Sequence, residues 1–267
     1  MRFFTFLITV SLLAGLTACA SRQVQPSPGA VDPDDVMGTL SNRQPEAAFA
    51  GKADIRMETR HQKQSATLHF LAQPADRFRG DITTVFGIPL ANLVVQGDEF
   101  AYFEQGENRF ITGRVGDARG LMLIPLKPSE LMTLVTGIPP LNEYEPEPLR
   151  VDERADHFRV LLRGREGGEL AMRVDKGSLL VRELIFSPEN IRVMFHRYRD
   201  TERGPVPEEV SIGTLDKQVS ATVRLGSWNF SPHVDAETFV LMAPPGAEQY
   251  RIFPKGATPD LHEPQSP

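Results

Sequence analysis

Hydrophobic and polar residues alternate along most of this chain, which is the pattern of β-strands with one buried face. In residues 51–60 (GKADIRMETR), Ala53, Ile55 and Met57 point one way and charged residues point the other. The same pattern predicts strands at residues 51–60, 65–73, 76–84, 91–97, 99–105, 108–113, 157–164, 168–175, 179–187, 190–200, 208–215 and 218–231. Turn-forming residues separate these segments at hairpin spacing. We therefore expect an antiparallel meander that must curl or close to hide its apolar face.

A short amphipathic helix is expected before the first strand. Residues 32–44 (DPDDVMGTLSNRQ) begin with Asp32 before a proline and have an acidic first turn. Val36, Met37 and Leu40 fall on one side of this helix. We expect that side to pack against the sheet.

A second helix is expected in the middle of the chain, at residues 127–140 (KPSELMTLVTGIPP). Ser129 can act as its N-cap, and Gly137 followed by Pro139 ends it. Its apolar stripe consists of Leu131, Leu134 and Val135. Because this helix interrupts a curled sheet, we expect it to cover the open side as a lid.

The N-terminal residues have the pattern of an export signal. Residues 3–15 form an apolar run that is too short to cross a bilayer as a helix. Residues 16–19 (LTAC) resemble the bacterial lipobox, which implies that Cys19 is acylated and becomes the first residue of the mature protein. The alternative is an ordinary signal peptide with an incidental cysteine. Ala20 stands where an aspartate would retain a lipoprotein at the inner membrane, so the resemblance implies anchoring in the outer membrane.

The chain divides into four expected parts. Residues 1–18 are the expected signal peptide, and residues 19–32 are rich in Pro, Ser, Gln and Gly, which is typical of a tether. Residues 33–253 form the expected folded domain, and residues 254–267 form a flexible tail.

Composition excludes several classes of protein. Removal of the signal peptide takes away Arg2 and no acid, so 28 basic residues face 35 acidic ones and the formal charge moves from −6 to −7. This balance argues against a nucleic-acid partner. Cys19 is the only cysteine, which excludes an internal disulfide framework.

A set of segments in order resembles the LolA/LolB lipoprotein-carrier superfamily, and more closely LolB, its outer-membrane receptor. These segments are residues 76–113 (DRFRGDITTVFGIPLANLVVQGDEFAYFEQGENRFITG), 134–140 (LVTGIPP) and 192–230, which end in an aromatic strand with Trp228. The resemblance extends over residues 48–230. Residues 231–252 depart from it and instead resemble the closing segment of LolA-type chains.

The resemblance implies a fold and a ligand. The fold would be mainly β with a few helices (α+β), a strongly curved antiparallel half-barrel whose helical lid encloses a hydrophobic cavity. The residues expected to line an acyl-chain cavity are Ala53, Ile55, Met57, Leu68, Phe70, Phe78, Ile82, Leu131, Leu134 and Val135. The alternative is that these side chains form an ordinary filled core.

The turn at residues 83–92 (TTVFGIPLAN) is unusually apolar for a connection between strands. LolB-like proteins carry a protruding apolar residue there that acts on the membrane, and Phe86 occupies that position. The resemblance therefore implies a membrane-facing loop with Phe86, Ile88 and Leu90. The alternative is that Phe86 and Leu90 fold back into the core as strand ends.

Nothing in the sequence points to catalysis, a metal or a cofactor. The six histidines are scattered without ligand spacing, at positions 61, 69, 157, 196, 233 and 262. Nucleophile-elbow and phosphate-loop motifs are absent. The acid-rich residues 143–156 are expected to form a solvated loop, and the arginines of residues 196–204 to lie on an outer strand face.

The sequence therefore predicts a monomeric outer-membrane lipoprotein that faces the periplasm. It would take lipoprotein acyl chains from a LolA-type carrier and insert them into the membrane. One alternative is a lipid- or glycolipid-binding, envelope-sensing lipoprotein of the same fold without transfer activity. Another is a purely structural lipoprotein with a filled core.

Overall fold

The computed structural model describes residues 35–43, 47–73, 77–115, 117, 128–187, 190–216, 218–230 and 232–252. Cys19 and the expected signal peptide, tether and tail lie outside these residues. Their assignments, and the expected limits of the domain, stay predictions.

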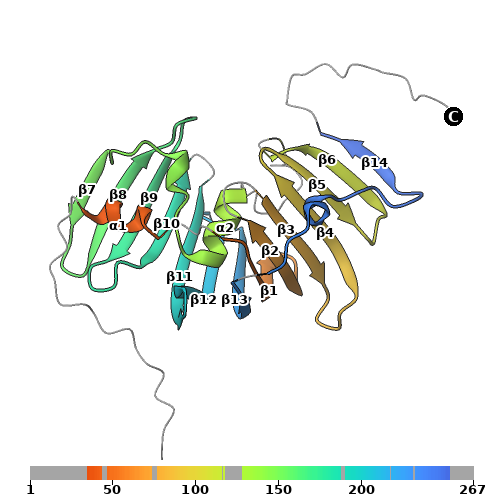
Figure 1. Ribbon diagram of the computed structural model, residues 1–267, viewed down its shortest axis with the longest axis horizontal. Helices are drawn as coiled ribbons and strands as arrows, with labels where there is room; N and C mark the ends of the chain where they lie inside the picture. Colours follow the sequence, from red (N-terminus) through yellow and green to blue (C-terminus); the bar gives the residue numbers. More distant parts are fainter. Residues whose placement is uncertain are drawn as a thin grey trace, which may run out of the picture.

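Across the described residues, one curved sheet contains fourteen strands (Figure 1). The first half of the sheet is made of β1 (Phe49–Thr59), β2 (Lys63–Gln73), β3 (Arg77–Thr83), β4 (Pro89–Gln96), β5 (Glu99–Glu104) and β6 (Arg109–Arg114). The second half is made of β7 (Arg150–Glu153), β8 (His157–Arg163), β9 (Glu169–Asp175), β10 (Val181–Ser187), β11 (Ile191–Thr201), β12 (Gly204–Thr214) and β13 (Val219–Asn229). β14 (Glu248–Arg251) completes it.

The two halves are meanders that meet in the middle of the sheet, where β1 pairs with β13. The strand order is β14-β6-β5-β4-β3-β2-β1-β13-β12-β11-β10-β9-β8-β7. All neighbours are antiparallel except β14 and β6, which are parallel. The consecutive strands β6 and β7 therefore lie far apart in the sheet, and the connection between them has to cross it.

Alternation along the strands builds one apolar face, which we call the inner face. In β1, Ala53 is buried and lies opposite Leu68 on one neighbour and Leu225 on the other. Most of the largest fully buried side chains, among them Phe158 and Phe186, belong to the strands of the second half. A single core cluster joins both halves, so burial of the inner face is the main stabilising term.

Helix α2 (Pro128–Thr136) crosses the sheet and contacts β3 in one half and β12 in the other (Figure 1). Leu134 and Val135 are buried in the core cluster, and Leu131 packs against it. The helix ends at Gly137, whose amide donates to the Thr133 carbonyl and whose φ is +72°. The helix and its glycine stop are therefore where the sequence predicts them, but Ser129 is not the N-cap, because the helix already begins at Pro128.

Helix α1 (Val36–Ser41) is shorter than the segment expected from the sequence. Val36 and Leu40 are buried and belong to the core cluster, as their spacing predicts. The expected acidic first turn is wrong, because the helix begins only after Asp35, whose side chain makes no capping hydrogen bond.

Two further strands correct the sequence-based expectations. Arg150–Glu153, inside the expected solvated loop, forms the edge strand β7 against β8. Glu248–Arg251 forms β14, which pairs with β6. Both strands have only four residues, so alternation cannot identify them, and pairing with an available sheet edge decides their conformation.

The C-terminal segment packs against the outer face, opposite the inner one. It contains the 3-10 helix η4 (Ala236–Phe239), which contacts β3 and β4. Arg79 donates to the Thr238 carbonyl at 3.0 Å, and the Arg77 guanidinium lies 5.9 Å from the Phe239 ring centre. A second 3-10 helix, η3 (Leu141–Glu143), follows α2. None of the helices in the described part of the chain is long and apolar enough to span a bilayer.

Candidate functional site

A pocket of about 430 Å³ opens where several elements end. This volume is within the range of sites for small organic ligands, roughly 300–1,000 Å³. Its lining is mostly apolar and consists of Leu40, Asn42, Arg43, Ala47, Ala48, Phe49, Thr136, Gly137, Ile138, Leu179, Leu180, Val181, Tyr198, Arg203, Gly204, Pro205, Val206, Trp228 and Phe230. The pocket therefore lies among the ends of both helices, the hairpin of β11 and β12, and the junction of β1 and β13.

Tyr198 lies between the end of α2 and the start of β10. Its hydroxyl donates to the Val181 carbonyl at 2.5 Å, and the Arg182 guanidinium lies 5.5 Å from its ring centre. Burial raises the pKa of Tyr198 well above its ordinary value. The phenol is therefore a neutral hydrogen-bond donor that ties β11 to β10 beside the pocket.

Two neighbouring irregularities in the pairing of β11 with β12 place Tyr198 there. The register shifts on both sides of Arg197, so His196 on β11 and Glu208 on β12 fall out of step. Phe195 and Tyr198 are three residues apart, yet both face the inner side, with ring centres 6.0 Å apart. Strict alternation would turn one of them outward.

Aromatic rings form one wall of the pocket. Trp228 stacks on Phe230 with ring centres 5.9 Å apart and an interplanar angle of 3°. Phe70 meets Trp228 edge to face at 5.8 Å, and Phe49 lies 6.2 Å from the indole. Gly51 makes room for this cluster, because a Cβ atom there would lie 2.5 Å from the Phe70 ring. The cluster forms a rigid apolar surface at the end of β13 and the start of β1.

Arg43 stands at the edge of the pocket and is held by backbone. It donates to the Leu179 carbonyl at 2.8 Å and to the Ser178 carbonyl at 3.1 Å. Desolvation lowers the pKa of Arg43 from its ordinary value, although it stays a cation at any physiological pH. Leu179 has a φ of +53°, which non-glycine residues seldom adopt. This turn thus directs its carbonyls toward the arginine.

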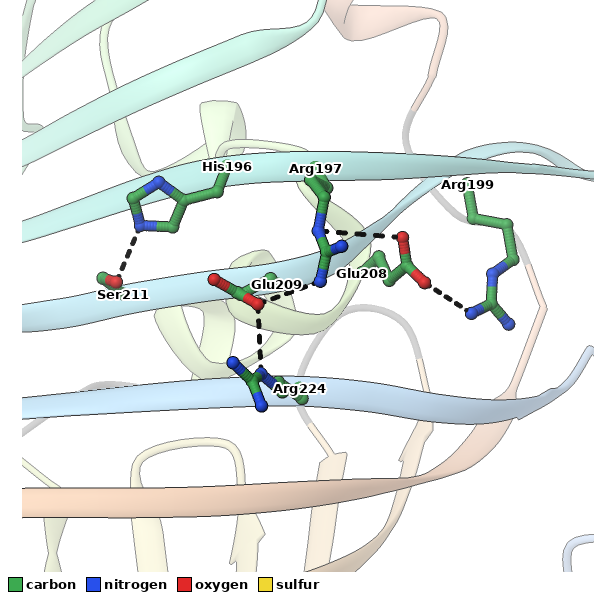
Figure 2. Close-up of polar contacts among 7 residues, drawn as sticks. All are labelled: His196, Arg197, Arg199, Glu208, Glu209, Ser211 and Arg224. Atoms are coloured by element: carbon green, nitrogen blue, oxygen red, sulfur yellow. Dashed lines mark hydrogen bonds and ion pairs between the residues drawn. The ribbon is translucent and has the colours of Figure 1, made fainter. Parts of the chain in front are cut away.

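On the outer face, the same strands carry a network of ion pairs (Figure 2). Glu209 binds both Arg197 and Arg224 at 3.0 Å, and Arg199 binds Glu208 at 2.8 Å. The hydrogen bond from Arg224 is the main cause that lowers the pKa of Glu209. Arg197 and Arg199 lie on the outer face, as the sequence predicts, and with Arg224 they link β11, β12 and β13 there. Arg203 does not follow the prediction, because it lies in the turn after β11 and lines the pocket.

The turn between β3 and β4 holds its apolar side chains in solvent. Phe86 is 89% exposed, Ile88 62% and Val85 61%. Leu90 is 39% exposed. The Thr84 hydroxyl accepts hydrogen bonds from the Phe86 and Ile88 amides, so the turn has a defined conformation. Phe86 and Leu90 therefore do not fold back into the core, and such exposed apolar groups are typical of contact sites.

The ten residues expected to line an acyl-chain cavity do not line this pocket. They lie on the inner face and on α2, where Ala53, Phe70, Phe78, Leu134 and Val135 are buried, and Ile55, Met57, Leu68, Ile82 and Leu131 are partly buried. The structure brings Phe70 next to the pocket through Trp228. Their role in binding a chain stays a prediction.

Acid–base and metal chemistry have little support in the described residues. They contain no group of three or more His, Cys, Asp or Glu side chains that could hold a metal ion. The histidines in this part of the chain that have polar partners bind single groups, such as Asp156 for His157 and Ser211 for His196. The mostly apolar lining of the pocket is suited to binding an apolar ligand.

Comparisons with known proteins relate the chain by fold. No protein-family model matches the sequence, and no curated protein matches it significantly. A solved DUF1329 family protein from Desulfovibrio piger is 9% identical, with a TM-score of 0.62 over 78% of this chain and 95% of that one. A LolA superfamily protein from Nitrosomonas europaea is 12% identical, with a TM-score of 0.56 over 79% and 99%.

A domain named for outer-membrane lipoprotein sorting, from Vibrio parahaemolyticus, has a TM-score of 0.58 at 8% identity, over 78% of this chain and 97% of that one. This chain has a LolA-like fold. The fold agrees with the superfamily that the sequence resembles, while the finer likeness to LolB rests on the sequence alone.

Proposed function

We propose that this protein is a non-catalytic outer-membrane lipoprotein that binds lipoprotein acyl chains and inserts them into the membrane. The observation that carries the proposal is the apolar pocket beside the end of α2. Burial of a methylene group contributes about 0.8 kcal/mol, so a chain of ordinary length gains enough to bind reversibly. The LolA-like fold supports a carrier role.

Anchoring by Cys19 would keep the domain at the periplasmic face of the outer membrane. Because an acylated cysteine of a lipoprotein carries more than one chain, such an anchor is stable. The tether of residues 19–32 would let the folded domain meet both a periplasmic carrier and the bilayer.

In the proposed mechanism, each transfer step lowers the free energy, so no nucleotide is needed. Acyl chains leave a LolA-type carrier and enter this domain, with α2 as the lid. As the lid moves, the chains would contact the ten residues that are expected to line a cavity, among them Ala53 and Val135. The loop with Phe86, Ile88 and Leu90 then inserts in the bilayer, where one phenylalanine contributes about 1.5–3 kcal/mol.

The decisive experiment is depletion of this protein in its own cells. We expect other lipoproteins to accumulate in the periplasm in complex with a carrier, and re-expression of the wild-type chain to reverse this. Normal incorporation of lipoproteins after depletion would contradict the proposal.

A further inference from the structure

The pocket lining carries positive charge, whereas the chain as a whole has a net negative charge. The chain as a whole carries 35 acidic and 29 basic residues. Among the described residues, in contrast, the pocket lining includes Arg43 and Arg203 and no aspartate or glutamate. A site for uncharged hydrocarbon alone has no need of two guanidinium groups at its edge, and the desolvation of Arg43 costs free energy.

The two arginines come from different elements and meet at the same pocket. Arg43 follows α1, and the carbonyls of Ser178 and Leu179 accept from two of the five N–H groups of its guanidinium. Arg203 lies in the exposed turn between β11 and β12. Within the described residues, neither side chain forms an ion pair with a carboxylate.

Neutral backbone carbonyls do not balance the charge of Arg43. Desolvation is the main influence on its pKa, and it acts against the cation. An anionic group placed between Arg43 and Arg203 would offset this cost, because guanidinium groups form strong charge-assisted hydrogen bonds with carboxylates and phosphates.

We infer that the pocket binds an amphiphile with an anionic headgroup, whose carboxylate or phosphate contacts Arg43 and Arg203 while its alkyl chain lies against Trp228, Phe230 and Ile138. This inference rests on the proposed function, which places the ligand's acyl chain in the pocket, and it adds the charge of the headgroup. The acylated cysteine of a lipoprotein is uncharged, so the ligand class extends to fatty acids and lysophospholipids.

The experiment compares probes that share one chain and differ in the headgroup. The protein is the chain from residue 19 onward with Cys19→Ser, which cannot be acylated and needs no detergent. The probes are palmitate, 1-palmitoyl lysophosphatidate and neutral 1-monopalmitoylglycerol. Trp228 is the only tryptophan in the sequence and lines the pocket, so its fluorescence reports binding.

We expect the two anionic probes to bind about tenfold more tightly than the neutral one, because one charge-assisted hydrogen bond contributes enough free energy for a tenfold gain in affinity. Arg203→Gln should reduce this ratio to near one with little change in the affinity for monopalmitoylglycerol. Arg203 has an exposed side chain, so this variant should fold. Arg199→Gln, on the outer face, is the matched control and should keep the wild-type ratio.

The outcomes separate this inference from the proposed function. Equal affinities for neutral and anionic probes would overturn the headgroup assignment and leave the acyl-chain pocket in place. A tenfold preference that survives in Arg203→Gln would also overturn it. If none of the probes binds, the pocket proposed for acyl chains fails as well. Tighter binding of palmitate would identify a fatty acid as the source of the headgroup, and tighter binding of lysophosphatidate would identify a phospholipid.

Discussion

A Cβ atom on Gly137 would lie 2.8 Å from both Cε1 and the hydroxyl oxygen of Tyr198, so the end of α2 rests directly on the tyrosine ring. The φ of Gly137 is +72° as well. Gly137→Ala should therefore lower the free energy of unfolding by about 2–4 kcal/mol, through backbone strain and overpacking. Urea unfolding measures this loss.

Gly106→Ala is the matched control for Gly137→Ala. A Cβ atom on Gly106 meets nothing within 4 Å, and its φ is not in the left-handed region. The control should stay within about 0.5 kcal/mol of the wild type. If Gly137→Ala does the same, α2 does not rest on Tyr198 in solution.

Tyr198 makes stability depend on pH in the alkaline range. Its folded pKa is raised, so its contribution is complete below about pH 10, the ordinary tyrosine pKa. Above that pH the unfolded chain loses its proton first, and the free energy of unfolding falls. Tyr198→Phe should flatten this fall and cost about 1–2 kcal/mol at neutral pH, because the Val181 carbonyl loses its hydrogen bond. Urea unfolding near pH 8 and near pH 11 tests both effects. A fall of wild-type steepness in the variant would assign the alkaline loss to other groups.

The exposed loop should govern contact with membranes without affecting the fold. Phe86→Glu changes a side chain that is 89% exposed, so the free energy of unfolding should change by less than about 0.5 kcal/mol. Binding of the unacylated protein to phospholipid vesicles should weaken about tenfold or more, since the apolar contact is lost. Met242→Glu, at a residue that is 79% exposed elsewhere, is the control and should bind as the wild type does. Equal losses in both variants would show that the β3–β4 loop has no special role.

Filling the pocket should prevent binding of an acyl chain. Ala48 lines the pocket just before β1, and Ala48→Phe places a ring in the space that the chain would occupy. We expect palmitate to bind at least tenfold more weakly, because the loss of contacts worth about 1.4 kcal/mol lowers the affinity tenfold. Trp228 fluorescence measures this affinity. Ala50→Phe adds the same ring at a neighbouring residue that does not line the pocket, and it should leave binding unchanged. Wild-type affinity in Ala48→Phe would place the ligand elsewhere.

The strands and α2 could be predicted because their burial repeats with a regular period. Ala53, Ile55 and Met57 in β1 alternate with charged residues, and the buried positions of α2 follow helical spacing. Such repeats record which face of an element is buried, and they require no knowledge of its neighbours.

The pocket could not be predicted in this way. Its lining comes from the ends of elements, such as residues 136–138, 179–181 and 203–206, where no period exists. Tyr198 reaches it only because the register of β11 shifts, which alternation cannot show. The one available signal was aromatic: Trp228 and Phe230 stand together at the end of the last long strand.

The course of the chain between β6 and β7 links α2 to the shape of the whole sheet. These strands lie toward opposite ends of the strand order, and in the described part of their connection α2 contacts both halves. Flattening of the sheet lengthens the span that this connection must cover, and tighter coiling shortens it. We therefore expect a ligand that spreads the two meanders to shift the position of α2.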